Sequence, residues 1–170
     1  MLFRSAYGDV HSLSTPEKNY LEDGFWAMTR GEEKYIKGKS VFFLRKVIDA
    51  TDEVKVVADS LRSLGQGAGM RRISSVLERR HNARSGMETM LMSMWRGSKY
   101  YVFFYEVYTD IRLVGAPPVS IAAYGGETDN WEWPQHKGDF ALYRVYANTD
   151  GKPAAYSESN VPLIPKKILS

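Results

Sequence analysis

The sequence predicts a mainly β domain, a barrel or a sandwich, that carries a short two-helix insertion. Aromatic residues make up 13% of the 170 residues, and aromatic side chains favour strands. Most of the short apolar runs end near Gly or Pro, as the strands of antiparallel sheets do. Helical spacing of apolar residues appears near the middle of the chain, over about residues 52–84. We therefore expect residues 1–170 to form one β-rich region with this helical excursion.

The first half of the chain is expected to hold one strand and the two helices. Residues 1–31 show no regular pattern, and Pro16 with the Ser and Thr before it favours a loop. Residues 39–48 form a short apolar run after a Gly and are predicted to be a strand. Thr51 is a helix N-cap residue type, and apolar residues follow it at helical spacing. A run of glycines separates this helix from a second one at about residues 70–84.

Strands dominate the second half. Residues 88–95 and 99–107 flank an Arg-Gly-Ser turn, which predicts a hairpin. Residues 111–114 and 119–123 flank a Gly-Ala-Pro-Pro turn, and both are expected to be strands. Residues 140–147 form the last clear strand pattern.

The composition excludes several kinds of site. The chain has no Cys, so a disulfide, a thiol nucleophile and a Cys-based zinc site are all excluded. The net charge of +3 is spread over 23 basic and 20 acidic residues and names no partner. The basic helix around residues 71–84 is expected to be a solvated face, and we expect no nucleic-acid partner. Three scattered His without spaced carboxylates predict no metal site, and no apolar run is long enough for a membrane-spanning helix.

One segment, residues 124–140, combines residue types that chemistry uses. Its sequence, YGGETDNWEWPQHKGDF, holds two Trp, one His, one Asn and four acidic residues. Its three Gly and one Pro prevent a regular element, and long polar loops of this kind are often functional. The structural alternative is an Ω-loop that packs on its own Trp side chains. Composition alone leaves both interpretations open.

The same segment carries a family resemblance. Residues 126–134 (GETDNWEWP), His136 and residues 138–140 (GDF) resemble the signature of the bacterial dipeptidyl-peptidases 7 and 11. Two further blocks agree, residues 20–27 (YLEDGFWA) and residues 107–118 (VYTDIRLVGAPP). The resemblance implies a partial chymotrypsin-like β-barrel from a serine exopeptidase that releases dipeptides from the N-termini of oligopeptides. It implies no cofactor and no metal.

The resemblance also assigns roles by position. Asp139 matches the aspartate of the catalytic triad, and Asn130 and Trp131 match residues that hold the free amine of the bound peptide. The residue types suit these roles, because a triad Asp orients the imidazole, while an amide carbonyl and an indole can bind and enclose an ammonium group. We expect His136 to be structural, since the family takes its catalytic His from far upstream, and we expect Trp133 to anchor the core.

The other two triad members are expected to lie outside this chain. The family's Thr-Asn-His-His-Cys-Gly block aligns with residues 1–6, which read MLFRSA, and no Ser here has the setting of the nucleophile. We therefore expect an N-terminal fragment that is inactive alone, and that is poorly soluble because surface normally covered by the rest of the protein is exposed. The full-length protein is expected in the periplasm or at the cell surface, and the resemblance allows a homodimer. The alternative function is a non-catalytic β-rich domain that binds peptide or glycan through the Trp-rich loop 124–140.

Overall fold

The computed structural model describes residues 3–123, 131, 137–155, 157 and 159–163, with the backbone alone for residues 3–6. The chain divides into two compact units. The first comprises Met1–Val41 and Tyr108–Ser170, and the second comprises Phe42–Val107. In the described part of the chain, no helix has both the length and the apolar character that crossing a membrane would require.

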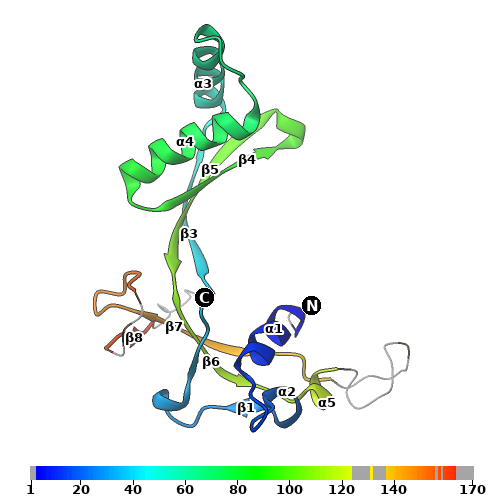
Figure 1. Cartoon of the computed structure of the whole chain (residues 1–170). Helices are drawn as coiled ribbons and strands as arrows, with labels where there is room; N and C mark the ends of the chain where they lie inside the picture. Colours follow the sequence, from blue (N-terminus) through cyan, green and yellow to red (C-terminus); the bar gives the residue numbers. More distant parts are fainter. Residues whose placement is uncertain (1–2, 124–130, 132–136, 156, 158, 164–170) are drawn as a thin grey trace, which may run out of the picture. The chain divides into compact units, whose positions relative to one another are not determined.

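A sheet built around one central strand organises the first unit (Figure 1). Strand β6 (Asp110–Ala116) pairs antiparallel with β1 (Phe25–Trp26), β2 (Lys34–Tyr35) and β7 (Leu142–Ala147). Strand β8 (Val161–Pro162) pairs with the far side of β7. The position of β6 explains its sequence, because a central strand buries most of its side chains, and Ile111 and Leu113 are fully buried.

The expectation of an irregular first segment was wrong. Helix α1 (Phe3–Leu13) and the short helix α2 (Tyr20–Asp23) lie there, followed by a 3-10 turn at Arg30–Glu32. Tertiary packing explains the difference, because Val10 of α1 is 2% exposed and joins a core cluster with Phe25 and Leu113. The loop chemistry at Pro16 is confined to the connection between the two helices.

The segment around Pro118 also differs from the sequence expectation. Strand β6 continues through Gly115 and Ala116, which we expected to be a turn, and residues 119–123 do not form a strand. They form helix α5 (Val119–Ala122), which follows Pro118 at φ −63°. The carbonyl of Pro118 accepts bonds from the amides of Ile121 and Ala122, so this first turn overrides the strand preference of Val and Ile.

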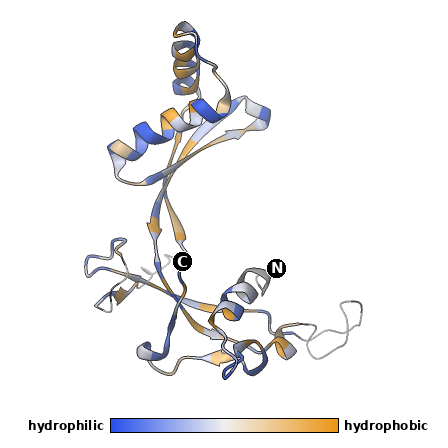
Figure 2. Cartoon of the chain, in the orientation of Figure 1, coloured by the Kyte–Doolittle hydropathy of each residue, from blue (hydrophilic) through white to orange (hydrophobic). Residues whose placement is uncertain are grey.

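The second unit is a three-stranded sheet with two helices. Strands β3 (Val41–Asp49), β5 (Lys99–Tyr108) and β4 (Glu88–Met94) pair in that order. The first residue of β3 and the last residue of β5 belong to the first unit. Helices α3 (Thr51–Ser63) and α4 (Met70–Ser85) confirm the predicted helix pair. Hydrophilic and hydrophobic residues alternate along α4 (Figure 2), which crosses the sheet (Figure 1) with Ile73 and Leu77 buried against α3.

The predicted hairpin is confirmed between β4 and β5. Its turn is a short 3-10 segment (Trp95–Gly97) in which Trp95, Arg96 and Gly97 all have positive φ. The register pairs Met94 with Lys99 and continues to the pair of Glu88 with Tyr105. Glycine suits the last turn position because L side chains rarely adopt its φ of +86°.

Candidate functional site

Asp139 carries an unsatisfied buried oxygen. It lies between α5 and β7, and among the described residues its Oδ1 atom is buried without a hydrogen-bond partner. An unpaired polar atom away from water costs about 1–3 kcal/mol, so native proteins rarely keep one without a reason. A carboxylate oxygen in this state is an acceptor for which this part of the chain supplies no donor.

The residues on either side of Asp139 are held in place. The amide of Gly138 donates to the carbonyl of Ile121 at 3.1 Å, which ties the segment to α5. A β-carbon at position 138 would lie 3.2 Å from Cγ2 of Ile121, so Gly permits this close approach. On the other side, the ring of Phe140 packs against Trp26 of β1, with centroids 6.0 Å apart and planes tilted by 55°.

Trp26 itself lies on the surface of the sheet beside Gly115. The two residues pair across β1 and β6, and Gly115 also pairs with Leu142 at the start of β7. A β-carbon on Gly115 would lie 2.5 Å from Cε3 and 2.6 Å from Cζ3 of the indole, so any side chain at position 115 would displace the indole from this place. This contact was not predicted from the sequence. A Gly within a strand pattern is the signal that could have indicated it.

The structure describes only one of the other residues that the sequence singled out in this segment. Trp131 is described, and 90% of its surface is exposed. Asn130, Trp133 and His136 lie outside the described residues. Of the three predicted site residues, Asp139 is therefore described with its surroundings, and Trp131 is described only by its exposure.

The other histidines do not gather into a site. His81 is buried, with Nε2 3.1 Å from Oε2 of Glu53 and its ring edge-on to Phe104. His11 stacks on Tyr7 at the surface of α1. Within the described ranges, no three His, Asp or Glu side chains come close enough together to hold a metal ion. We interpret His81 as a core histidine that links α3, α4 and β5.

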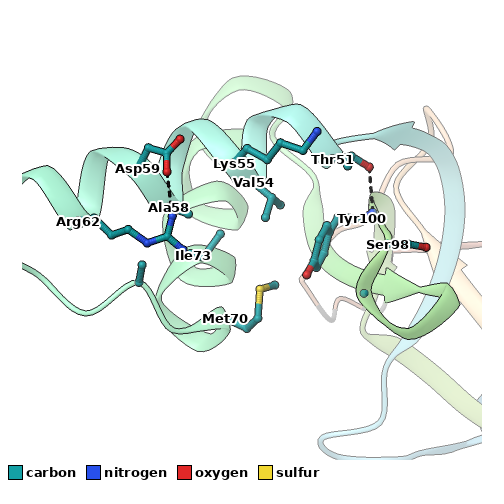
Figure 3. A pocket seen from close by; sticks show the side chains of 12 residues that line it. Thr51, Val54, Lys55, Ala58, Asp59, Arg62, Met70, Ile73, Ser98 and Tyr100 are labelled. Carbon is teal, nitrogen blue, oxygen red and sulfur yellow. Dashed lines mark hydrogen bonds and ion pairs between the residues drawn. The ribbon is translucent and has the colours of Figure 1, made fainter.

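A pocket in the second unit lies between α3, the start of α4 and the hairpin turn (Figure 3). It measures about 430 Å³ and has a partly apolar lining that includes Val54, Met70 and Ile73. Its rim charges are already paired, since Arg62 contacts Asp59 at 2.8 Å. Lys55 contacts Asp52 outside the pocket at 3.0 Å. These ion pairs partly neutralise the charges along α3 near the pocket.

Two polar clusters, the first partly buried and the second built on a buried carboxylate, hold β7, the strand that follows Asp139. In the first, Oδ2 of Asp9 accepts from Nζ of Lys39 at 2.5 Å and from Oη of Tyr143 at 2.8 Å. Burial, reinforced by the hydrogen bond to Asp9, raises the pKa of Tyr143 well above its ordinary value of 10.0. This cluster joins α1 to β7.

In the second cluster the carboxylate of Glu33 is almost fully buried. It accepts from Oη of Tyr146 at 2.7 Å and from Nη1 of Arg144, and its side chain is 1% exposed. Burial raises the pKa of Tyr146, and the hydrogen bond to Glu33 adds to the effect. The guanidinium of Arg112 lies over the Tyr146 ring at 4.9 Å from its centroid. These contacts fix the position of β7 relative to β6.

Comparison with known proteins assigns the chain to a family. The model of the family described as Peptidase S46 matches residues 3–170. The chain belongs to the peptidase S46 family. Its similar relatives include a "Dipeptidyl-peptidase 7" of Capnocytophaga gingivalis, 38% identical over 96% of this chain and 23% of the relative. An "Asp/Glu-specific dipeptidyl-peptidase" of Porphyromonas gingivalis is 41% identical over 96% of this chain and 24% of the relative.

Solved structures of S46 relatives share this fold. The crystal structure of Porphyromonas endodontalis DPP11 in complex with the dipeptide Arg-Asp has a TM-score of 0.82 at 36% sequence identity. The match covers 97% of this chain and 25% of that one. This likeness confirms the mainly β fold, a partial barrel with short helices, and it confirms the family resemblance. The chain spans about a quarter of the length of the S46 relatives it matches.

Proposed function

We propose that this chain is the part of a serine dipeptidyl-peptidase that supplies the aspartate of the catalytic triad. The substrate is an oligopeptide with a free N-terminus, and the reaction is release of its first two residues by acyl transfer. The observation that carries the proposal is the buried, unpaired Oδ1 of Asp139 in a member of the S46 family. Relatives named dipeptidyl-peptidases support the reaction class.

A triad aspartate needs the surroundings that Asp139 has. Its carboxylate accepts a hydrogen bond from Nδ1–H of the catalytic imidazole, selects the reactive tautomer and stabilises the imidazolium that forms when the serine attacks. The oxygen must be shielded from water and must not be used by another donor. Oδ1 of Asp139 meets both conditions among the described residues. In this proposal the catalytic His and Ser belong to other parts of the full-length protein.

Asn130 and Trp131 are proposed to hold the N-terminal end of the peptide. An enzyme that removes dipeptides must measure length from the free amine, which requires an acceptor for the ammonium group and a wall behind it. The Asn130 carbonyl suits the first task and the Trp131 indole the second. The high exposure of Trp131 is compatible with contact to a bound peptide.

The test uses the full-length protein that carries this chain and compares Asp139→Asn with Asp150→Asn. Asp150 lies exposed in the turn after β7, so its substitution is the matched control. Asp139→Asn should lower kcat on a fluorogenic dipeptidyl substrate by about 10³- to 10⁴-fold with KM little changed, because the imidazole is held in the wrong tautomer. Asp150→Asn should leave kcat unchanged. A kcat for Asp139→Asn within tenfold of the unmodified enzyme would overturn the proposal.

We also propose that the full-length protein acts as a homodimer in the periplasm or at the cell surface. The support is the family resemblance. Cell fractionation followed by light scattering of the purified protein tests both parts. A cytoplasmic pool or a monomeric mass would contradict the corresponding part.

A further inference from the structure

We infer that Trp26 is a positioning residue for Asp139. Its indole can take up the required place because Gly115 has no side chain to displace it. This inference rests on the proposed role of Asp139 and names a residue that orients its carboxylate. Trp26 is not assigned to contact substrate. It acts through Phe140, the residue that follows Asp139 in the chain.

Trp26 packs directly over Gly115. A β-carbon at position 115 would lie against the six-membered ring of the indole, 2.5 Å from its Cε3 atom and 3.2 Å from its Cδ2 atom. Backbone pairing fixes both partners, because Trp26 is opposite Gly115 and the amide of Ala27 donates to the carbonyl of Val114 at 2.8 Å. The indole can occupy this place only because residue 115 is Gly.

Phe140 connects the indole to Asp139. The Phe140 ring packs on Trp26 at a centroid distance of 6.0 Å, and the amide of Gly138 is bonded to the carbonyl of Ile121. Asp139 is therefore held at both neighbours, by a hydrogen bond before it and by an aromatic contact after it. The planar peptide bond leaves two backbone torsions between the α-carbons of Asp139 and Phe140, ψ of Asp139 and φ of Phe140. A displacement of the Phe140 backbone therefore moves the backbone that carries the Asp139 carboxylate. Catalytic groups lose much of their effect when displaced by about 1 Å.

Exposure separates this role from ordinary core packing. Trp26 is 53% exposed and Phe140 41% exposed, so neither is part of the buried cluster that stabilises the first unit. Leu113 and Phe25 of that cluster are almost fully buried by comparison. Within this chain the aromatic pair therefore adds little to the core, and its contact with the site is through Phe140, the residue that follows Asp139.

The experiment is a double-mutant cycle in the full-length enzyme with Trp26→Ala, Gly115→Ala and the double variant. Each single variant should lower kcat by about 10- to 100-fold with KM within twofold, since the triad is disordered and substrate binding is not. The kcat of the double variant should be no lower than that of Trp26→Ala, because the new β-carbon then meets no indole.

Two further variants serve as controls. Trp26→Phe keeps a ring against Phe140 and should retain most of the activity. Trp95→Ala, which removes an exposed Trp that packs on Tyr101, is the matched control and should be unaffected.

A pH profile distinguishes positioning from a general loss of structure. A misplaced Asp139 stabilises the imidazolium less, so the acidic limb of kcat/KM should move to lower pH in Trp26→Ala and Gly115→Ala. A second readout needs no activity. In the full-length protein labelled with ¹³C at aspartate carboxyls, the resonance that disappears in Asp139→Asn should shift in both variants and not in Trp95→Ala.

The outcomes separate this inference from the proposed function. Wild-type kcat, pH profile and Asp139 resonance in both Trp26→Ala and Gly115→Ala, with Asp139→Asn inactive, would overturn the inference and leave the proposed function standing. Additive losses in the double variant would also overturn it. An active Asp139→Asn would overturn the proposed function, and the inference with it.

Discussion

Oη of Tyr143 lies 2.8 Å from Oδ2 of Asp9 and donates a hydrogen bond to it across 134 positions of sequence. Asp9 belongs to α1 and Tyr143 to β7, so this contact joins the start of the first unit to the strand that follows Asp139. Nζ of Lys39 binds the same oxygen and lies 4.7 Å from the centroid of the Tyr143 ring. The cluster therefore couples the position of β7 to the protonation of one phenol.

Tyr143→Phe should make the stability of the chain less sensitive to alkaline pH. The pKa of Tyr143 is raised in the folded state, so the folded chain keeps a proton that the unfolded chain loses above its ordinary pKa of 10.0. Stability is therefore fully present below pH 10 and is lost as the pH rises from there toward the folded pKa. Tyr143→Phe should cost about 1–2 kcal/mol at pH 8 for the lost hydrogen bond, and this difference should shrink above pH 10. Urea unfolding at a series of pH values measures it.

Tyr20→Phe is the control for this series. Tyr20 packs at the edge of the same core, where its ring meets Phe25 edge-on at 5.0 Å. Its substitution should change the unfolding free energy little and should leave the alkaline slope as in the unmodified chain. Parallel curves for Tyr143→Phe and the unmodified chain would contradict the prediction.

Glu33→Gln should destabilise the first unit strongly. The substitution removes the buried charge that pairs with Arg144 and weakens the bond from Tyr146. Breaking a buried pair by neutralising one partner costs about 3–5 kcal/mol, and the partial exposure of Arg144 places the expected loss near the lower end of this range. Glu17→Gln, at an exposed position before α2, should cost almost nothing. Equal midpoints of urea unfolding for the two variants would show that the Glu33 cluster does not stabilise the fold.

Asp49→Asn should reduce stability near neutral pH and lose its effect in acid. Hydrogen bonds from Thr51 and then from Lys99 hold the pKa of Asp49 well below its ordinary value of 3.8. A lowered folded pKa means that the stabilisation is present above pH 3.8 and is lost as the pH falls through the folded pKa. The difference between Asp49→Asn and the unmodified chain should therefore narrow below pH 3.8. It should also narrow in high salt, since Lys99 and Asp49 are both solvent-accessible. A difference independent of both pH and salt would contradict the assignment.

The sequence predicted the elements whose signals are local. The helix pair, β3 and the β4–β5 hairpin follow from apolar spacing and from the Arg-Gly-Ser turn, all within a few residues of each element. Helix α1 was missed because its main stabilising contact is the burial of Val10 against β1 and β6, which no local pattern indicates. Residues 119–123 were misassigned because Val119 and Ile121 prefer strands, whereas Pro118 starts a helical turn.

In the candidate site, too, the local feature could be predicted and the tertiary contacts could not. Asp139 could be named from its sequence block, and the structure adds the buried state of its Oδ1 atom. The contacts that hold its neighbours could not be predicted, because Trp26, Gly115 and Ile121 come from three other elements. The pairing register of β1, β6 and β7 brings Trp26 and Gly115 together, and the hydrogen bond from Gly138 ties Ile121 to the segment that holds Asp139.

The 170-residue chain alone should show no turnover of a dipeptidyl substrate. Under the proposed function it supplies one triad member, and loss of a single member lowers kcat by about four orders of magnitude or more. The measurement compares hydrolysis by the purified chain with the same sample treated with a serine-directed inhibitor. Turnover above the treated sample would mean that the nucleophile lies in this chain, contrary to the assignment.

The apolar side chains around Asp139 should make the isolated chain bind hydrophobic dye. Trp26, Ile121, Phe140 and Leu142 are 53%, 50%, 41% and 48% exposed. They are linked by the contacts of Trp26 with Phe140 and Gly115, by the pairing of Gly115 with Leu142 and by the bond from Gly138 to Ile121. Contiguous apolar surface of this kind usually marks an interface and favours aggregation when uncovered.

The double substitution Ile121→Gln with Leu142→Thr tests this surface without touching Trp26 or Phe140. It should lower the fluorescence of bound anilinonaphthalene sulfonate and raise the concentration at which the chain stays soluble, because two of the four apolar side chains become polar. Met28→Gln is the matched control, since Met28 is 85% exposed and is not among the four side chains. Equal dye binding for the double variant and the Met28→Gln control would show that the dye binds elsewhere. Aggregation would then have to come from a different apolar surface, such as Phe42, Leu44 and Val47 on β3 of the second unit, which are 55%, 51% and 43% exposed.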